Sequence, residues 1–192
     1  MKNFLLFFWE ILKITIIAFL IVLPIRYYVF QPFIVKGESM EPNFENGNYL
    51  IVDELSYHFR DPQRGEVVVF KYPKNPSQRY IKRVIGLPGE TVKIKDGKIT
   101  IYKENSSPIT LEEFGYLPFS HYTEGNLAIK LGSNEYFVLG DNRTGNRSYD
   151  SRWWGPVPRE NIIGRVLIRA WPLAELKFFG LPQYQFNQEV KR

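Results

Sequence analysis

Hydrophobic and polar positions follow different patterns in two parts of the chain. From Phe4 to Phe30 almost every residue is apolar, and the main interruptions are Glu10, Lys13, Pro24 and Arg26. A helix of about 20 apolar residues is long enough to cross a bilayer. Glu10 and Lys13 are three residues apart, so on a helix they share a face and partly neutralise each other. The pattern therefore predicts one amino-terminal transmembrane helix.

The alternative for this segment is a signal peptide that is removed from the mature protein. The segment is long for a signal peptide, and no small-x-small cleavage site follows it. We therefore predict an uncleaved signal-anchor over residues 1–30 that crosses a cell membrane once. The basic residues on either side of the apolar run favour a cytoplasmic amino terminus.

Beyond Gln31 the apolar residues form short runs separated by Gly, Pro, Asn and Asp, which predict β-strands. Lys95–Lys98, with the sequence Lys-Asp-Gly-Lys between two alternating runs, predicts a tight hairpin. A brief helical turn is expected at Pro158–Asn161. The candidate strands are, in chain order, Phe33–Lys36, Asn48–Asp53, Glu66–Tyr72, Tyr80–Gly86, Thr91–Ile94, Lys98–Tyr102, Glu135–Leu139 and Ile163–Ala170.

These strands predict a mainly β domain over residues 31–192, folded as an antiparallel sheet or a partial barrel. Residues 103–131 differ from their surroundings because Pro, Gly, Asn and Ser break any periodicity there. We expect this segment to form an inserted loop or a small subdomain.

The composition excludes several kinds of chemistry. The chain has no cysteine, so disulfides and thiolate metal sites are excluded. Its formal net charge is +5, but the basic residues are scattered, so we expect no nucleic-acid partner. It has no His-Glu-x-x-His motif, phosphate-binding loop or dinucleotide-binding glycine motif. We therefore expect no metal and no other cofactor.

Ser39 is the first candidate for catalytic chemistry. It lies in Gly-Glu-Ser-Met-Glu-Pro, where Gly37 permits an unusual backbone conformation and Pro42 restricts the chain just after the turn. A serine on such a bend can present its hydroxyl as a nucleophile and its own amide as an oxyanion donor. The alternative is a serine that only caps a turn, which is common.

Lys82 is the second candidate, within Tyr80–Glu90. A lysine can act as a general base when burial among apolar residues keeps its amine neutral. Alternation puts Lys82 and Tyr80 on one face of the strand, and it puts Arg83 on the other face. At least one of the two cations therefore borders apolar surface. Periodicity does not decide whether Lys82 or Arg83 is the buried cation. The alternative is that Lys82 faces solvent, as most lysines in strands do.

A polar cluster follows the strand that ends at Leu139, in Gly140–Arg152. It is either a long polar loop with local hydrogen bonds or a group of side chains that orients a catalytic base. An ion pair between Asp150 and Arg152 is able to hold the loop rigid. His58 and His121 have no partner at ligand spacing, so we expect both to be surface or packing residues.

Taken together, these segments resemble the bacterial type I signal peptidases, a family of Ser/Lys proteases. Four blocks follow the predicted anchor in the order of the family: Gly37–Phe44, Gly65–Phe70, Tyr80–Glu90 and Gly140–Arg152. The resemblance implies that Ser39 is the nucleophile, with its backbone amide in the oxyanion hole, and that Lys82 is the general base. It also implies that Ser148 and Asp150 support the lysine, with Arg152 beside them.

The chain departs from the family pattern in two places. Some members have a serine two residues before the nucleophile that donates to the oxyanion, and this chain has Gly37 there. The family usually has two residues between Gly-Asp-Asn-Arg and the supporting serine, and this chain has the four residues 144–147. This spacing favours Ser148 over Ser151 as the supporting serine.

The resemblance implies that the substrates are exported preproteins with small residues one and three positions before the cut. The substrate is expected to add as a strand between Phe33–Lys36 and the segment leading into Lys82. The residues expected to bind it are Phe33, Ile34, Val35 and Tyr80. The other expected partner is the lipid membrane, with the catalytic domain on the extracytoplasmic side. Two alternatives are a self-cleaving repressor-type Ser/Lys protease and a non-enzymatic, membrane-tethered binding protein.

Overall fold

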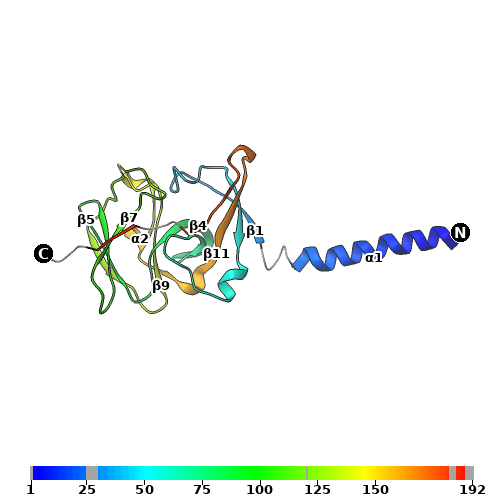
Figure 1. Ribbon diagram of the computed structural model, residues 1–192, viewed down its shortest axis with the longest axis horizontal. Helices are drawn as coiled ribbons and strands as arrows, with labels where there is room; N and C mark the ends of the chain where they lie inside the picture. Colours follow the sequence, from blue (N-terminus) through cyan, green and yellow to red (C-terminus); the bar gives the residue numbers. More distant parts are fainter. Residues whose placement is uncertain (1, 25–29, 120, 182–184, 189–192) are drawn as a thin grey trace.

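The computed structural model describes residues 2–24, 30–119, 121–181 and 185–188. Its first element is helix α1 (Lys2–Pro24), which extends away from the β-rich part of the molecule (Figure 1). Large apolar side chains of this helix are exposed, including Phe7, Trp9 and Phe19. Within the described residues, no helix has both the length and the apolar character that crossing a membrane requires. The spanning helix predicted within residues 1–30 is therefore not confirmed, and residues 1 and 25–29 lie outside the described part.

The rest of the described chain forms two antiparallel sheets (Figure 1). The larger sheet has eight strands in the order β1-β2-β11-β3-β4-β9-β10, with β12 paired to β11. Its strands are β1 (Phe30–Ile34), β2 (Tyr49–Asp53), β3 (Val67–Tyr72), β4 (Asn75–Gly86), β9 (Glu135–Leu139), β10 (Val157–Pro158), β11 (Ile162–Trp171) and β12 (Lys177–Phe178).

The smaller sheet has five strands in the order β13-β7-β6-β5-β8. Its strands are β5 (Thr91–Lys95), β6 (Lys98–Tyr102), β7 (Ile109–Glu112), β8 (Leu127–Lys130) and β13 (Gln185–Gln188). Short helical elements join the strands: η2 (Leu55–His58), η3 (Gly145–Arg147), α2 (Ser151–Trp154), η4 (Arg159–Asn161) and η5 (Leu173–Glu175).

The prediction of a mainly β, antiparallel fold is confirmed. The Lys95–Lys98 hairpin joins β5 to β6, and Asp96 and Gly97 have φ angles of 51° and 76°, as a tight two-residue turn requires. The helical turn expected at Pro158–Asn161 corresponds to η4. Five strands were not predicted: β10 and β12 have only two residues each, and β7, β8 and β13 lie in segments without clear alternation.

Residues 103–131 contribute two strands, β7 and β8, to the smaller sheet. Strand β8 pairs with β5 and β7 pairs with β6, both of which precede this segment in the chain, and β7 also pairs with β13. The structural unit around the segment therefore begins at Thr91, earlier than the break in periodicity indicates. The reason is that β8 pairs with β5 across a connection too long for local patterns to reveal.

The apolar core positions β3 and β4, and β4 carries Lys82. Val68, Phe70 and Val84 belong to one buried cluster, whereas Val67 and Val69 belong to another, so β3 is buried on both faces as its continuous apolar run predicts. A third cluster joins the two sheets, with β4 and β9 contributing to it from the larger sheet. Each large apolar side chain that is fully buried stabilises the fold by about 1.5–3 kcal/mol.

Candidate active site

Ser39 lies in a tight turn just after β1. Gly37 has a φ of 87°, a conformation that favours glycine, and its amide donates to Asn46 Oδ1 at 3.0 Å. The amide of Phe44 donates to the carbonyl oxygen of Met40 at 2.9 Å, and both side chains are fully buried. The buried side chains after the serine therefore hold the turn rigidly on the domain.

A second segment holds Ser39 from the other side. Asn142 donates its amide to the carbonyl oxygen of Ser39 at 3.1 Å and its side-chain Nδ2 to that of Glu38 at 3.1 Å. Gly140 lies so close that an added Cβ would be 2.1 Å from Ser148 Oγ and 2.3 Å from the Ser39 carbonyl oxygen. Only glycine fits there, because any side chain at position 140 would clash with Ser39 or Ser148.

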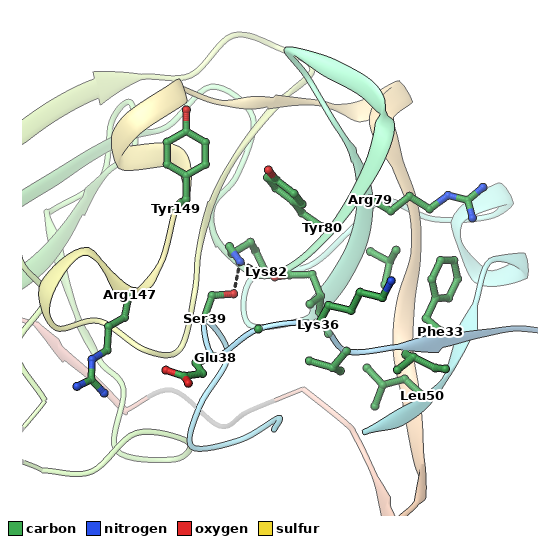
Figure 2. A pocket seen from close by; sticks show the side chains of 15 residues that line it. Phe33, Lys36, Glu38, Ser39, Leu50, Arg79, Tyr80, Lys82, Arg147 and Tyr149 are labelled. Atoms are coloured by element: carbon green, nitrogen blue, oxygen red, sulfur yellow. Dashed lines mark hydrogen bonds between the residues drawn. The ribbon is translucent and has the colours of Figure 1, made fainter. Parts of the chain in front are cut away.

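Lys82 lies in β4 opposite Val68, and only 4% of its surface is exposed. Its Nζ is 2.5 Å from Ser39 Oγ and 3.0 Å from the carbonyl oxygen of Ile81, to which it donates (Figure 2). Burial lowers the pKa of this amine from 10.5 to about 8, although the charges of Asp150 and Asp141 act in the opposite direction. About half of the amine is therefore neutral at a mildly alkaline pH near 8, whereas an ordinary lysine would be almost fully charged there.

The neighbouring cation Arg83 has a different environment. Its Nε donates to Asp141 Oδ1 at 2.8 Å and its Nη1 to the carbonyl oxygen of Gly65 at 2.9 Å. Lys82, in contrast, has no carboxylate within ion-pair distance in the described part of the chain. The alternation of β4 therefore separates a paired, structural cation from a buried amine that faces a serine hydroxyl.

Ser148, Asp150 and Arg152 form one buried cluster. Ser148 Oγ donates to Asp150 Oδ2 at 2.7 Å, and Arg152 donates to both carboxylate oxygens of Asp150, at 2.8 and 2.9 Å. The same carboxylate accepts the amide of Gly140 at 3.1 Å. Among the described residues, Lys82 has no hydrogen bond to Ser148, so the contact of Ser148 is with Asp150.

Ser151, the other serine of the block, accepts the amide of Val138 at 3.0 Å through its Oγ. It is buried against β9 and begins helix α2, whose first turn is capped by Asp150. This bond gives Ser151 a role in joining α2 to the larger sheet.

His121 was expected to be a surface or packing residue, and the structure gives it a charged partner. Its Nε2 lies 3.3 Å from Glu113 Oε2, and this interaction raises the pKa of His121. Glu113 is also paired with the buried Arg143, at 2.5 Å from Oε1 to Nη2. Glu113 and His121 belong to residues 103–131, and their pairing with each other and with Arg143 forms only when the chain is folded. This ion-pair cluster attaches that segment to the loop that contacts Ser39.

A cavity of about 450 Å³ opens over Ser39 and Lys82 (Figure 2). The four residues predicted to bind substrate, Phe33, Ile34, Val35 and Tyr80, all line it. Other residues that line it were not predicted, namely Lys36, Gly37, Glu38, Leu50, Val69, Arg79, Ile81, Arg147 and Tyr149. Leu50 and Val69 come from β2 and β3, and no local sequence signal separates them from other core residues.

An antiparallel β domain with a serine hydroxyl against a buried amine, both at one peptide-sized cavity, has the arrangement of a Ser/Lys hydrolase. The family model described as "Signal peptidase, peptidase S26" matches residues 8–171. The chain therefore belongs to the signal peptidase family of serine peptidases, as the sequence resemblance implies.

Two curated relatives agree with this assignment. The chain is 42% identical over 181 residues to signal peptidase I of Leptolyngbya laminosa, covering 90% of this chain and 84% of that protein. It is 33% identical over 158 residues to signal peptidase I V of Bacillus subtilis (strain 168), covering 79% and 92%. A solved signal peptidase I from Enterococcus faecalis V583 is 32% identical, with a TM-score of 0.43, and the match covers 55% of this chain and 97% of that one.

Proposed function

We propose that this protein is a membrane-bound endopeptidase that removes signal peptides from exported preproteins with Ser39 as nucleophile and Lys82 as general base. The observation that carries the proposal is the 2.5 Å separation of Ser39 Oγ and Lys82 Nζ at a cavity large enough for a peptide. Membership of the signal peptidase family favours this function over a self-cleaving repressor and over a non-enzymatic binding protein.

The reaction proceeds through an acyl-enzyme. Neutral Lys82 accepts the proton of Ser39 Oγ while that oxygen attacks the substrate carbonyl carbon. The tetrahedral intermediate collapses, the peptide C–N bond breaks, and Lys82 returns the proton to the leaving amine. Lys82 then takes a proton from water as the water oxygen attacks the ester, and it gives that proton back to Ser39 Oγ when the signal peptide leaves as a carboxylate.

The backbone amide of Ser39 is the proposed oxyanion donor. It donates no hydrogen bond to any described residue, so it is available to the substrate. The amide of Gly37, in contrast, is already bonded to Asn46. Because Gly37 also lacks a side chain, the Ser39 amide is the only oxyanion donor that we assign.

The substrate is proposed to bind as an added strand. Strand β1 is at one end of the larger sheet, so one of its edges has no neighbouring strand within that sheet. Such an edge accepts an extended peptide through main-chain hydrogen bonds. Phe33, Ile34, Val35 and Tyr80 supply apolar walls next to Ser39, which suit small side chains before the cut.

The pH dependence of cleavage tests the role of Lys82. Because only the neutral amine accepts a proton, kcat/KM should rise with pH through a midpoint of about 8, the lowered pKa of Lys82. The charge of Asp150 raises this pKa, so Asp150→Asn should shift the midpoint to lower pH, as measured with a preprotein over a buffered pH series. A midpoint at the ordinary lysine value of about 10.4, or no shift in the variant, would contradict the proposal.

Helix α1 is the proposed attachment to the membrane, with the catalytic domain on the extracytoplasmic side. The proposal is supported by the exposed apolar side chains of α1, such as Phe7 and Ile14, which water does not favour. The full chain should stay with membranes during alkaline carbonate extraction and dissolve only in detergent. A variant that starts at Gln31 should be released without detergent while it retains cleavage of a soluble peptide. Release of the full chain by carbonate alone would contradict a stable attachment.

A further inference from the structure

Arg147 lines the same cavity as Ser39 and Lys82, yet the proposed mechanism gives it no part. It ends the η3 turn (Gly145–Arg147), in the segment whose length departs from the usual family spacing. Gly145 has a φ of 60°, which allows the chain to bend there and return to Ser148. The longer segment thus places an arginine at the wall of the cavity.

The guanidinium of Arg147 is free to bind a ligand. Among the arginines in the described ranges, it is the one without a hydrogen bond, an ion pair or a ring contact, and its side chain is exposed. Arg79, which lines the same cavity, lies over the ring of Phe33 at 5.6 Å from the ring centroid. A carboxylate can therefore bind Arg147 without first breaking an internal interaction.

The position of Arg147 indicates which part of the substrate it meets. Figure 2 shows Arg147 and Tyr149 on one side of the Ser39–Lys82 pair, and Phe33 and Leu50 on the other. The apolar side is the one proposed above for the residues before the cut, so this step rests on the proposed function. A peptide that extends through the cavity then places the residues after the cut on the side of Arg147.

The charges around the cavity favour an acidic group there. Its exposed cations are Lys36, Arg79 and Arg147, whereas Glu38 is the only acidic residue among the described residues that line it. Lys82 adds no positive charge in its neutral, active form. A guanidinium also matches a carboxylate in shape, because two parallel N–H groups can donate to its two oxygens.

We propose that Arg147 determines specificity by binding an acidic side chain within the first three residues after the cleavage site. The ion pair forms at the open side of the cavity, so it changes the choice among substrates rather than the chemistry at Ser39. An exposed ion pair of this kind changes an equilibrium by a factor of about 2 to 5, and repulsion of a basic residue adds a similar factor.

The test compares three preproteins that differ only in the three residues after the cut. These residues are Glu in the first substrate, Gln in the second and Lys in the third. With the wild-type protein, kcat/KM should be about 3- to 10-fold higher for the Glu substrate than for the Lys substrate, and the ratio should fall as salt is raised. Arg147→Ala should bring the ratio close to 1, and Arg147→Glu should reverse it. Arg79→Ala is the matched control, because it removes a cation from the other side of the cavity and should keep the ratio.

Each outcome separates the inference from the proposed function. If the Gln substrate is cleaved normally but both Arg147 variants keep the wild-type ratio, the inference is wrong and the proposed function stands. Loss of the ratio in Arg79→Ala as well would assign the preference to general positive charge and overturn the role of Arg147. If the wild-type protein cleaves none of the three substrates, the proposed function itself fails, and the inference with it.

Discussion

Ser39→Ala should lower the rate of preprotein cleavage by at least about 10⁴-fold, the scale on which serine proteases lose activity without their nucleophile. The substitution removes one oxygen from a turn that is held by backbone hydrogen bonds and by the buried side chains of Met40 and Phe44. The fold should therefore remain intact. The measurement is cleavage of a signal-peptide-bearing preprotein in detergent, with thermal unfolding recorded for the same samples.

The control is Ser106→Ala, which removes a hydroxyl from an exposed position in the segment that joins β6 to β7. This variant should cleave at the wild-type rate. A Ser39→Ala protein that keeps more than about a tenth of wild-type activity would rule out Ser39 as the nucleophile, because no covalent ester can then form.

Lys82→Met should lower cleavage by at least about 10³-fold while the free energy of unfolding stays the same or increases. Methionine fills nearly the same volume as the lysine stem, but it has no amine to accept the proton of Ser39 Oγ. The buried amine also makes the folded state less stable, since burial disfavours its charged form. Activity and stability should therefore change in opposite directions, as measured by preprotein cleavage and by denaturant unfolding.

The adjacent residue of β4 provides the matched control. Arg83→Met breaks the buried ion pair with Asp141 and leaves that carboxylate without its guanidinium, so it should cost about 3–5 kcal/mol of stability. Two neighbouring cations should thus give contrasting results, with a stable inactive protein at Lys82 and a destabilised one at Arg83. A Lys82→Met protein that is strongly destabilised, or that still cleaves, would contradict the assigned role.

Much of the fold was predictable because its signals are local. The strands Lys98–Tyr102 and Glu135–Leu139 have the predicted bounds, and the Asp96–Gly97 turn follows from residues that accept positive φ. Strand β4 begins at Asn75 instead of Tyr80, because its first residues are polar and exposed and their pairing with β3 is not visible as alternation. The two-residue strands β10 and β12 have no period to detect.

The candidate site, like the fold, was predictable where its signals are local. Short motifs identify Ser39, Lys82, Ser148 and Asp150, since each lies in a distinctive run of turn or strand residues. Their mutual contacts were less predictable: the resemblance implies only that Ser148 and Asp150 support the lysine, and in the structure the hydroxyl of Ser148 donates to Asp150. The partner of a hydroxyl depends on differences of about 1 Å that sequence spacing does not specify.

By itself, the sequence determined that the chain is mainly β, that it belongs with the signal peptidases, and which serine and lysine are the candidates for catalysis. These properties depend on residue types over a few neighbouring positions. The tertiary structure decided which of the two adjacent cations of β4 is paired with a carboxylate and which faces Ser39. It also decided that Leu50, Val69 and Arg147 line the cavity. The physical reason is that β1, β3, β4 and the Gly140–Arg152 loop meet only when the larger sheet is assembled, and burial and charge pairing are properties of that assembly.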